Sequence, residues 1–85
     1  MAVAIAIRVR FFARLREVAG KDIEDVKIPG DARVVDVYEA MLRAHPGLPP
    51  RDSVRGALNH EFVDWSAKVA DGDEVAFIPP VSGGA

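Results

Sequence analysis

Residues 3–11 alternate strictly between large apolar side chains and small or charged ones. The large apolar side chains stand at the odd positions: Val3, Ile5, Ile7, Val9 and Phe11. Successive side chains of a β-strand point to opposite faces, so this period of two predicts a strand with one buried face. A strand with one apolar face needs a second layer to cover that face.

A pattern in the middle of the chain supplies this layer. The following residues recur at the spacing of one face of an α-helix: Val34, Val37, Tyr38, Met41 and Leu42. That spacing predicts the main helix of the protein. We expect Asp31 to cap its start, and Pro46 and Gly47 to end it.

Shorter patterns complete the order of elements. We expect a short helix at 13–19, which Gly20 ends because glycine readily adopts the left-handed conformation. Strands are expected at 23–28, 54–58, 62–65 and 74–78. The order is therefore strand, short helix, strand, long helix and three strands. It predicts an α+β protein with a β-grasp, ubiquitin-like fold, in which one main helix lies across a mixed sheet.

Composition narrows the class of protein. The 85 residues suffice for one domain, which we expect at 1–80, followed by a flexible tail at 81–85. The absence of cysteine excludes disulfides and zinc-thiolate sites, and a net charge of −2 argues against nucleic-acid binding. Arg8 and Arg10 follow the apolar start, whereas a signal peptide carries its positive charge before it. We therefore expect a cytoplasmic protein that does not contact membranes.

Common catalytic patterns are weak in this chain. His45 and His60 are the only histidines, and they do not stand at a metal-ligand spacing. The serines have no nucleophile-elbow context, and the glycines form no phosphate-binding loop. We expect no metal site and no permanently bound cofactor.

The C-terminus carries the most informative motif. After the last expected strand come Pro79, Pro80, Val81, Ser82, Gly83 and Gly84. Glycines have no Cβ and adopt most backbone conformations, so such an end can enter a narrow channel and present a carbonyl carbon. A frayed terminus is the ordinary alternative. The position of this motif after the last strand of a ubiquitin-like order favours the functional interpretation.

Two motifs at opposite ends of the chain resemble one known family. VRFFARLREVAG at 9–20 and DGDEVAFIPPVSGG at 71–84, with ALN at 57–59 and FV at 62–63, are similar to the small, sulfur-carrying subunits of molybdopterin synthase. The resemblance covers essentially the whole chain. The motif at 9–20 separates this family from the sulfur carriers of thiamine and cysteine synthesis, which share the fold and the Gly-Gly end.

The resemblance implies a mechanism centred on Gly84, with Gly83 beside it. An ATP-dependent, E1-like adenylyltransferase would activate the Gly84 carboxylate, and a sulfur donor protein would convert it to a thiocarboxylate. The tail would then enter the large subunit of molybdopterin synthase and give its sulfur to a cyclic pyranopterin. ATP and the catalytic side chains would belong to the partners, in a heterotetramer with two small and two large subunits.

The resemblance also implies a docking surface. Its positions in this sequence are Phe12, Phe62 and Ile78, together with Pro79 to Ser82 of the tail. Exposed aromatic side chains beside a working terminus suit a transient interface. Core packing is the alternative for all three positions, and it is nearly as well supported for Phe12. Arg14 and Arg16 are candidates for polar contacts at the rim.

Two positions depart from the family pattern. Arg33 stands where relatives often have a threonine that caps the helix. Ala85 follows Gly84, so the free carboxylate of this sequence belongs to alanine. Proteolytic removal, a remnant of cloning and a non-functional end are three explanations. We expect the active form to end at Gly84.

Three other functions share these features. The chain could carry sulfur for thiamine or cysteine synthesis, and the acceptor enzyme that it binds would distinguish these. It could be a ubiquitin-like modifier, which would form high-mass adducts on lysines. It could be an interaction module with an inert tail, which would keep its function after deletion of 81–85.

Overall fold

The computed structural model describes residues 3–79. In chain order its elements are β1 (Ala4–Phe11), α1 (Arg14–Ala19), β2 (Ile23–Pro29), α2 (Val34–Ala44), a 3-10 helix (Arg51–Ser53), β3 (Arg55–Leu58), β4 (Glu61–Val63) and β5 (Glu74–Ile78). This is the predicted order, with an added 3-10 helix between α2 and β3, where the sequence predicted no element. The expected boundary between a domain at 1–80 and a tail at 81–85 lies outside the described residues.

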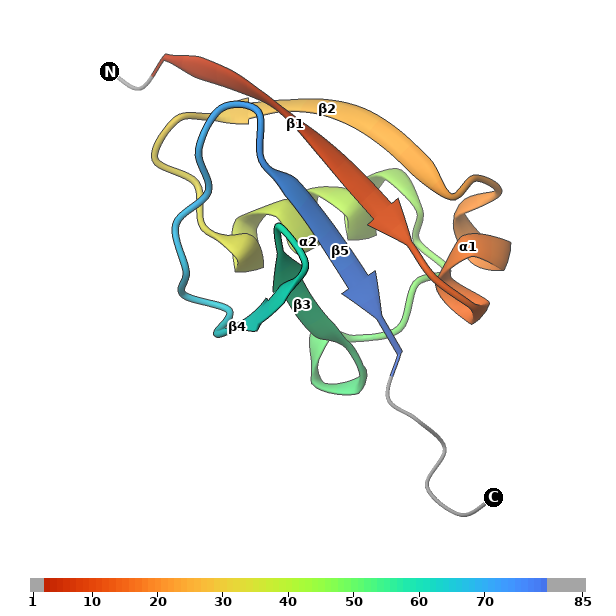
Figure 1. Ribbon diagram of the computed structural model, residues 1–85. Helices are drawn as coiled ribbons and strands as arrows, with labels where there is room; N and C mark the ends of the chain where they lie inside the picture. Colours follow the sequence, from red (N-terminus) through yellow and green to blue (C-terminus); the bar gives the residue numbers. More distant parts are fainter. Residues whose placement is uncertain (1–2, 80–85) are drawn as a thin grey trace.

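The five strands form one mixed sheet in the order β2-β1-β5-β3-β4. β1 and β5 run parallel, whereas the other neighbouring strands are antiparallel. α2 crosses behind the sheet, and the face toward the viewer has no helix over it (Figure 1). This is the β-grasp, ubiquitin-like architecture, so the predicted fold class is confirmed. Within residues 3–79, no helix is both long and apolar enough to cross a membrane.

The core lies between the sheet and α2. Ile7, Val9 and Phe11 of β1 are at most 3% exposed, as the alternation predicts. Val3, in contrast, is 80% exposed, and Ile5 is half-buried. The start of β1 projects beyond α2 at the upper left of Figure 1, so the helix does not cover it. The predicted buried face is therefore wrong at Val3.

The predicted stripe of α2 forms the other side of the core. Four of its residues are at most 3% exposed: Val34, Val37, Tyr38 and Met41. Leu42, the fifth, is only partly buried and packs against this cluster. The helix spacing in the sequence therefore identified the face that contacts the sheet.

The cap of α2 differs from the expected one. The N-cap is Arg33, two residues after Asp31. The Asp36 carboxylate, in the first turn, accepts the Arg33 backbone N–H at 2.8 Å. An arginine side chain has no acceptor, so Asp36 supplies the side-chain half of this cap alone. The expectation for Asp31 was wrong because the acidic cap acts from inside the helix.

β4 ends at Val63, two residues earlier than predicted, because the following backbone serves α2. The Trp65 carbonyl accepts the Val35 N–H at 2.9 Å, and the Ala67 carbonyl accepts the Val34 N–H at 2.9 Å. The first N–H groups of a helix have no partner within the helix, so these bonds satisfy them. The chain therefore leaves the sheet after Val63 to pair with the helix N-terminus.

Candidate docking face and carrier terminus

A row of side chains crosses four strands on the open face of the sheet. Strand pairing places Arg10 opposite Ala76, Ala76 opposite Ala57, and Ala57 opposite Phe62. Residues directly opposite each other share one face of a sheet. Both alanines are less than 10% exposed although no helix covers them. Larger side chains around them therefore close over the middle of the row.

A second row lies nearer the end of β5. Ile78 stands opposite Arg55. The Phe12 N–H donates to the Phe77 carbonyl at 3.3 Å, which continues the pairing of β1 with β5 and places Phe12 beside Ile78. The apolar members of the two rows form a continuous surface, named here the open-face patch: Phe12, Ala57, Phe62, Ala76 and Ile78.

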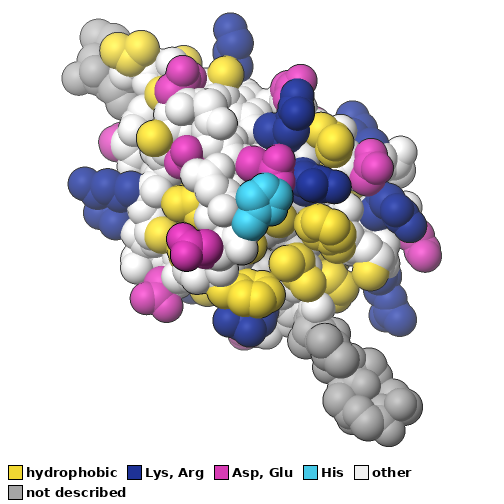
Figure 2. Space-filling view, in the orientation of Figure 1, with side chains coloured by type: hydrophobic (Ala, Val, Ile, Leu, Met, Phe, Trp, Pro, Cys, Tyr) yellow, Lys and Arg dark blue, Asp and Glu magenta, His cyan; other side chains and the backbone are white. Residues whose placement is uncertain are grey.

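The two phenylalanines of the patch are exposed to solvent. Phe62 is 55% exposed and Phe12 is 38% exposed, whereas the neighbouring Phe11 is 1% exposed. In Figure 2, hydrophobic side chains gather on this face beside the point where the grey C-terminal atoms begin. Core packing is therefore the wrong interpretation for Phe12 and Phe62. Their role in docking remains a prediction, although the structure brings both residues and Ile78 together as that role requires.

The other predicted positions divide into two groups. Pro79 directly follows β5 and is partly buried, and Arg14 and Arg16 are exposed on α1. The remaining positions, Pro80 to Gly84, lie outside the described residues. Because Pro80 is bonded to Pro79, the segment that contains Gly83 and Gly84 starts beside the open-face patch. The structure thus joins the two parts of the expected site through the chain itself.

Two arginines, not predicted as site residues, cover the exposed rings. The Arg10 guanidinium lies 5.1 Å from the centroid of the Phe12 ring, and the Arg55 guanidinium lies 4.0 Å from that of Phe62. A guanidinium over an aromatic face is attracted by the ring quadrupole. Arg10 and Phe12 are two residues apart, but the alternating run ends at Phe11, and nothing local pairs Arg55 with Phe62.

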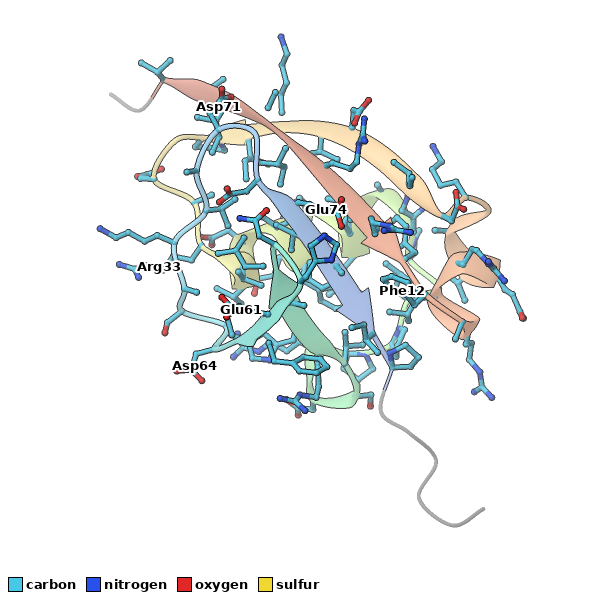
Figure 3. The ribbon with its side chains drawn as sticks, in the orientation of Figure 1. Phe12, Arg33, Glu61, Asp64, Asp71 and Glu74 are labelled. Carbon is cyan, nitrogen blue, oxygen red and sulfur yellow. The ribbon has the colours of Figure 1, made fainter. Side chains whose placement is uncertain are left out.

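Glu74 is the acidic neighbour of this surface (Figure 3). One of its carboxylate oxygens lies 3.6 Å from an Arg10 nitrogen and 3.9 Å from His60 Nε2. Asn59 fixes the turn between β3 and β4 against the start of β5, since its side-chain oxygen accepts the Glu74 N–H at 3.0 Å. His60, the next residue of this turn, is exposed.

His45, at the C-terminal end of α2, makes contacts that stabilise the fold. Its Nε2 lies 3.0 Å from a Glu24 carboxylate oxygen, and its ring meets the edge of Phe11 at a centroid distance of 5.7 Å. These contacts join the end of α2 to the beginning of β2. Across residues 3–79, no three histidine or acidic side chains are grouped as metal ligands.

Comparison with known proteins agrees with this geometry. Residues 9–84 match the ThiS family. The molybdopterin synthase sulfur carrier subunit of Chlamydomonas reinhardtii is 44% identical over 84 residues, which cover 92% of this chain and 98% of the relative. Small archaeal modifier protein 1 of Haloferax volcanii is 39% identical over 84 residues, with coverage of 88% and 97%.

The fold comparison points the same way. The crystal structure of SAMP1 from Haloferax volcanii superposes with a TM-score of 0.82 at 38% sequence identity, over 93% of this chain and 99% of that one. The match in sequence spans the motif at 9–20, the hairpin and the Gly-Gly end together. The chain therefore belongs to the ThiS family of small, ubiquitin-like β-grasp proteins, in which it is similar to sulfur carrier subunits of molybdopterin synthase.

Proposed function

We propose that this chain is the sulfur-carrying small subunit of a molybdopterin synthase. The observation that supports this most is the joint position of two features. An exposed aromatic patch lies on the open face, and the segment leading to Gly83 and Gly84 starts at its margin. A partner that binds the patch thereby receives the carrier end at a fixed starting point. The relatives named as sulfur carrier subunits support this assignment.

The proposed chemistry takes place on the carboxylate of Gly84. One carboxylate oxygen attacks the α-phosphorus of ATP on an E1-like enzyme, and pyrophosphate leaves. Hydrosulfide delivered by a donor protein then attacks the acyl carbon, AMP leaves, and the thiocarboxylate forms. On the large subunit, the thiocarboxylate sulfur attacks a carbon of the cyclic pyranopterin, the bond from that carbon to an oxygen substituent breaks and the oxygen leaves, and hydrolysis of the resulting thioester frees the Gly84 carboxylate. Acid–base groups and the ATP site come from the partner enzymes, in the cytoplasm.

This chemistry requires that Gly84 be the last residue. In the present sequence Ala85 follows Gly84, so the Gly84 carbonyl is part of a peptide bond. An amide offers no carboxylate oxygen to attack ATP. We propose that the active form ends at Gly84 and that Ala85 is removed before activation.

An intact-mass measurement tests the function and the end together. Two forms of the chain, one ending at Gly84 and one at Ala85, are incubated with the E1-like enzyme, ATP and a sulfur donor. We expect the form ending at Gly84 to exchange one oxygen for sulfur and the longer form to keep its mass. Equal conversion of both would refute the requirement for removal. No conversion of either would refute the carrier function and favour an interaction module.

A second function, protein modification, is favoured by one specific observation. A relative of 39% identity is named small archaeal modifier protein 1. An activated Gly84 that reacts with a lysine amine instead of a sulfur donor would form an isopeptide bond. Adducts of high mass in lysate, lost when the chain ends at Ser82, would establish this function. Binding to a thiamine or cysteine synthesis enzyme, and not to the large subunit, would assign the chain to those carriers.

A further inference from the structure

Arg10 and Arg55, the cations beside the open-face patch, have few acceptors among residues 3–79. Within residues 3–79, no acidic side chain lies within ion-pair distance of Arg55, and no acceptor takes a hydrogen bond from its guanidinium. Arg10 has one acidic neighbour, Glu74, at 3.6 Å, and its Nε is buried without a hydrogen-bond partner among the described atoms. Both guanidinium groups thus retain hydrogen-bonding capacity that the described residues do not use.

The position of these arginines makes that capacity important for binding. Arg55 stands opposite Ile78, and Arg10 stands opposite Ala76, so both lie within the rows that form the patch. A partner that covers the patch removes water from the two guanidinium groups as well. A cation that loses water without gaining an anionic acceptor opposes binding strongly.

Stacking on the rings also restricts the positions of the guanidinium groups of Arg10 and Arg55. Each guanidinium lies over an exposed ring, at 5.1 Å for Arg10 on Phe12 and 4.0 Å for Arg55 on Phe62. A planar guanidinium held over a ring keeps its edge donors free for a carboxylate, which it binds with two parallel hydrogen bonds. In Figure 2, dark-blue basic side chains border the hydrophobic group on this face.

We propose that Arg10 and Arg55 determine the specificity of the open-face patch, which accepts a protein surface with an apolar centre and a carboxylate facing each arginine. This inference rests on the proposed function, because the large subunit of molybdopterin synthase is the partner to be tested. It goes beyond that function by stating the chemistry of the partner surface. Partners that are apolar but lack the two carboxylates bind poorly, since they leave the arginines without water and without an anion.

The test measures the dissociation constant for the large subunit from the same organism over a series of salt concentrations. The variants are Arg10→Met, Arg55→Met and the double variant, because methionine keeps an apolar stem and removes the charge. We expect each single substitution to weaken binding at low salt by about tenfold and to reduce the salt dependence. Arg43→Met is the matched control, since Arg43 is an exposed arginine of α2, on the opposite side of the sheet from the patch.

Lysine variants separate charge from geometry and guard against misfolding. Arg10→Lys and Arg55→Lys keep the charge, so we expect them to retain the salt dependence of the wild type while losing affinity from the lost stacking and paired hydrogen bonds. If the wild type binds and the methionine variants have the same affinity and salt dependence as the wild type, this inference is overturned. The proposed function would then still stand. Absence of binding by the wild-type chain would overturn the proposed function, and this inference with it.

Discussion

Phe11 and Phe12 are adjacent in sequence but lie in opposite environments. Phe11 is 1% exposed and belongs to the core, whereas Phe12 is 38% exposed on the open-face patch. We expect Phe11→Ala to lower the free energy of unfolding by about 3–5 kcal/mol, because it leaves a cavity in the core. Phe12→Ala should cost less than about 1 kcal/mol, since Phe12 lies on the surface outside the core and removing its ring leaves no enclosed cavity. Urea unfolding of the two variants measures the difference.

Binding should show the reverse order of importance. A folded Phe12→Ala variant should lose affinity for the large subunit, because aromatic side chains at the centre of an interface contribute much of its binding energy. A Phe12→Ala variant that unfolds as readily as Phe11→Ala would contradict its surface position. A stable variant with full affinity would remove Phe12 from the docking surface.

At the scale of elements, the start of α2 depends on Asp36. Its carboxylate accepts the Arg33 N–H at 2.8 Å, so Asp36→Ala leaves this group without its side-chain partner. The substitution also removes a negative charge from the helix N-terminus, where it is favourable. We expect a loss of about 1 kcal/mol in the free energy of unfolding, measured by urea titration.

Asp31→Ala is the natural control for this prediction. Asp31 is acidic and exposed like Asp36, and it lies two residues before the N-cap. The Asp31→Ala variant should therefore unfold at nearly the same urea concentration as the wild type. A larger effect at Asp31 than at Asp36 would restore the cap that the sequence alone favoured.

The same elements show what the sequence could and could not predict. β1 and α2 were recognised because their apolar periods, two and near 3.6, depend only on local geometry. The order of elements then indicated the fold. The cap at Arg33, the early end of β4 and the stacking of Arg55 on Phe62 depend on contacts between distant segments. No local pattern specifies that the Trp65 carbonyl accepts a bond from α2 or that β3 and β4 bring those side chains together.

The residues of the candidate site divide in the same way, into those that the sequence predicted and those that depend on contacts between distant segments. Phe12, Phe62 and Ile78 were predicted through resemblance, and the sheet register brings them to one patch. The sequence could not decide whether Phe12 faces the core or solvent, because it follows the alternating run at the point where the strand ends. The contribution of Arg10 and Arg55 emerged only with the distances across the sheet.

At the scale of the whole molecule, Tyr38 connects the helix, the sheet and the loop after α2. It is fully buried, its ring centroid lies 4.8 Å from that of Phe77, and its hydroxyl donates to the Pro49 carbonyl at 2.6 Å. Burial raises the pKa of Tyr38 from 10.0 to about 12. Because this is the only tyrosine of the chain, its phenolate absorbance reports on one group alone.

The raised pKa predicts how the stability of the protein changes with pH. Below the unfolded value near 10, Tyr38 is neutral in both states and its contribution is constant. As pH rises from about 10 to about 12, the unfolded chain releases this proton while the folded chain keeps it, so the free energy of unfolding falls. The native absorbance titration should therefore have its midpoint well above that in urea. Tyr38→Phe, which should lose this part of the pH dependence, isolates the contribution of the phenol. A midpoint close to pH 10 for Tyr38 in the native protein would contradict this prediction. It would show that solvent reaches the ring and that α2, the sheet and the loop pack less tightly in solution than in the structure.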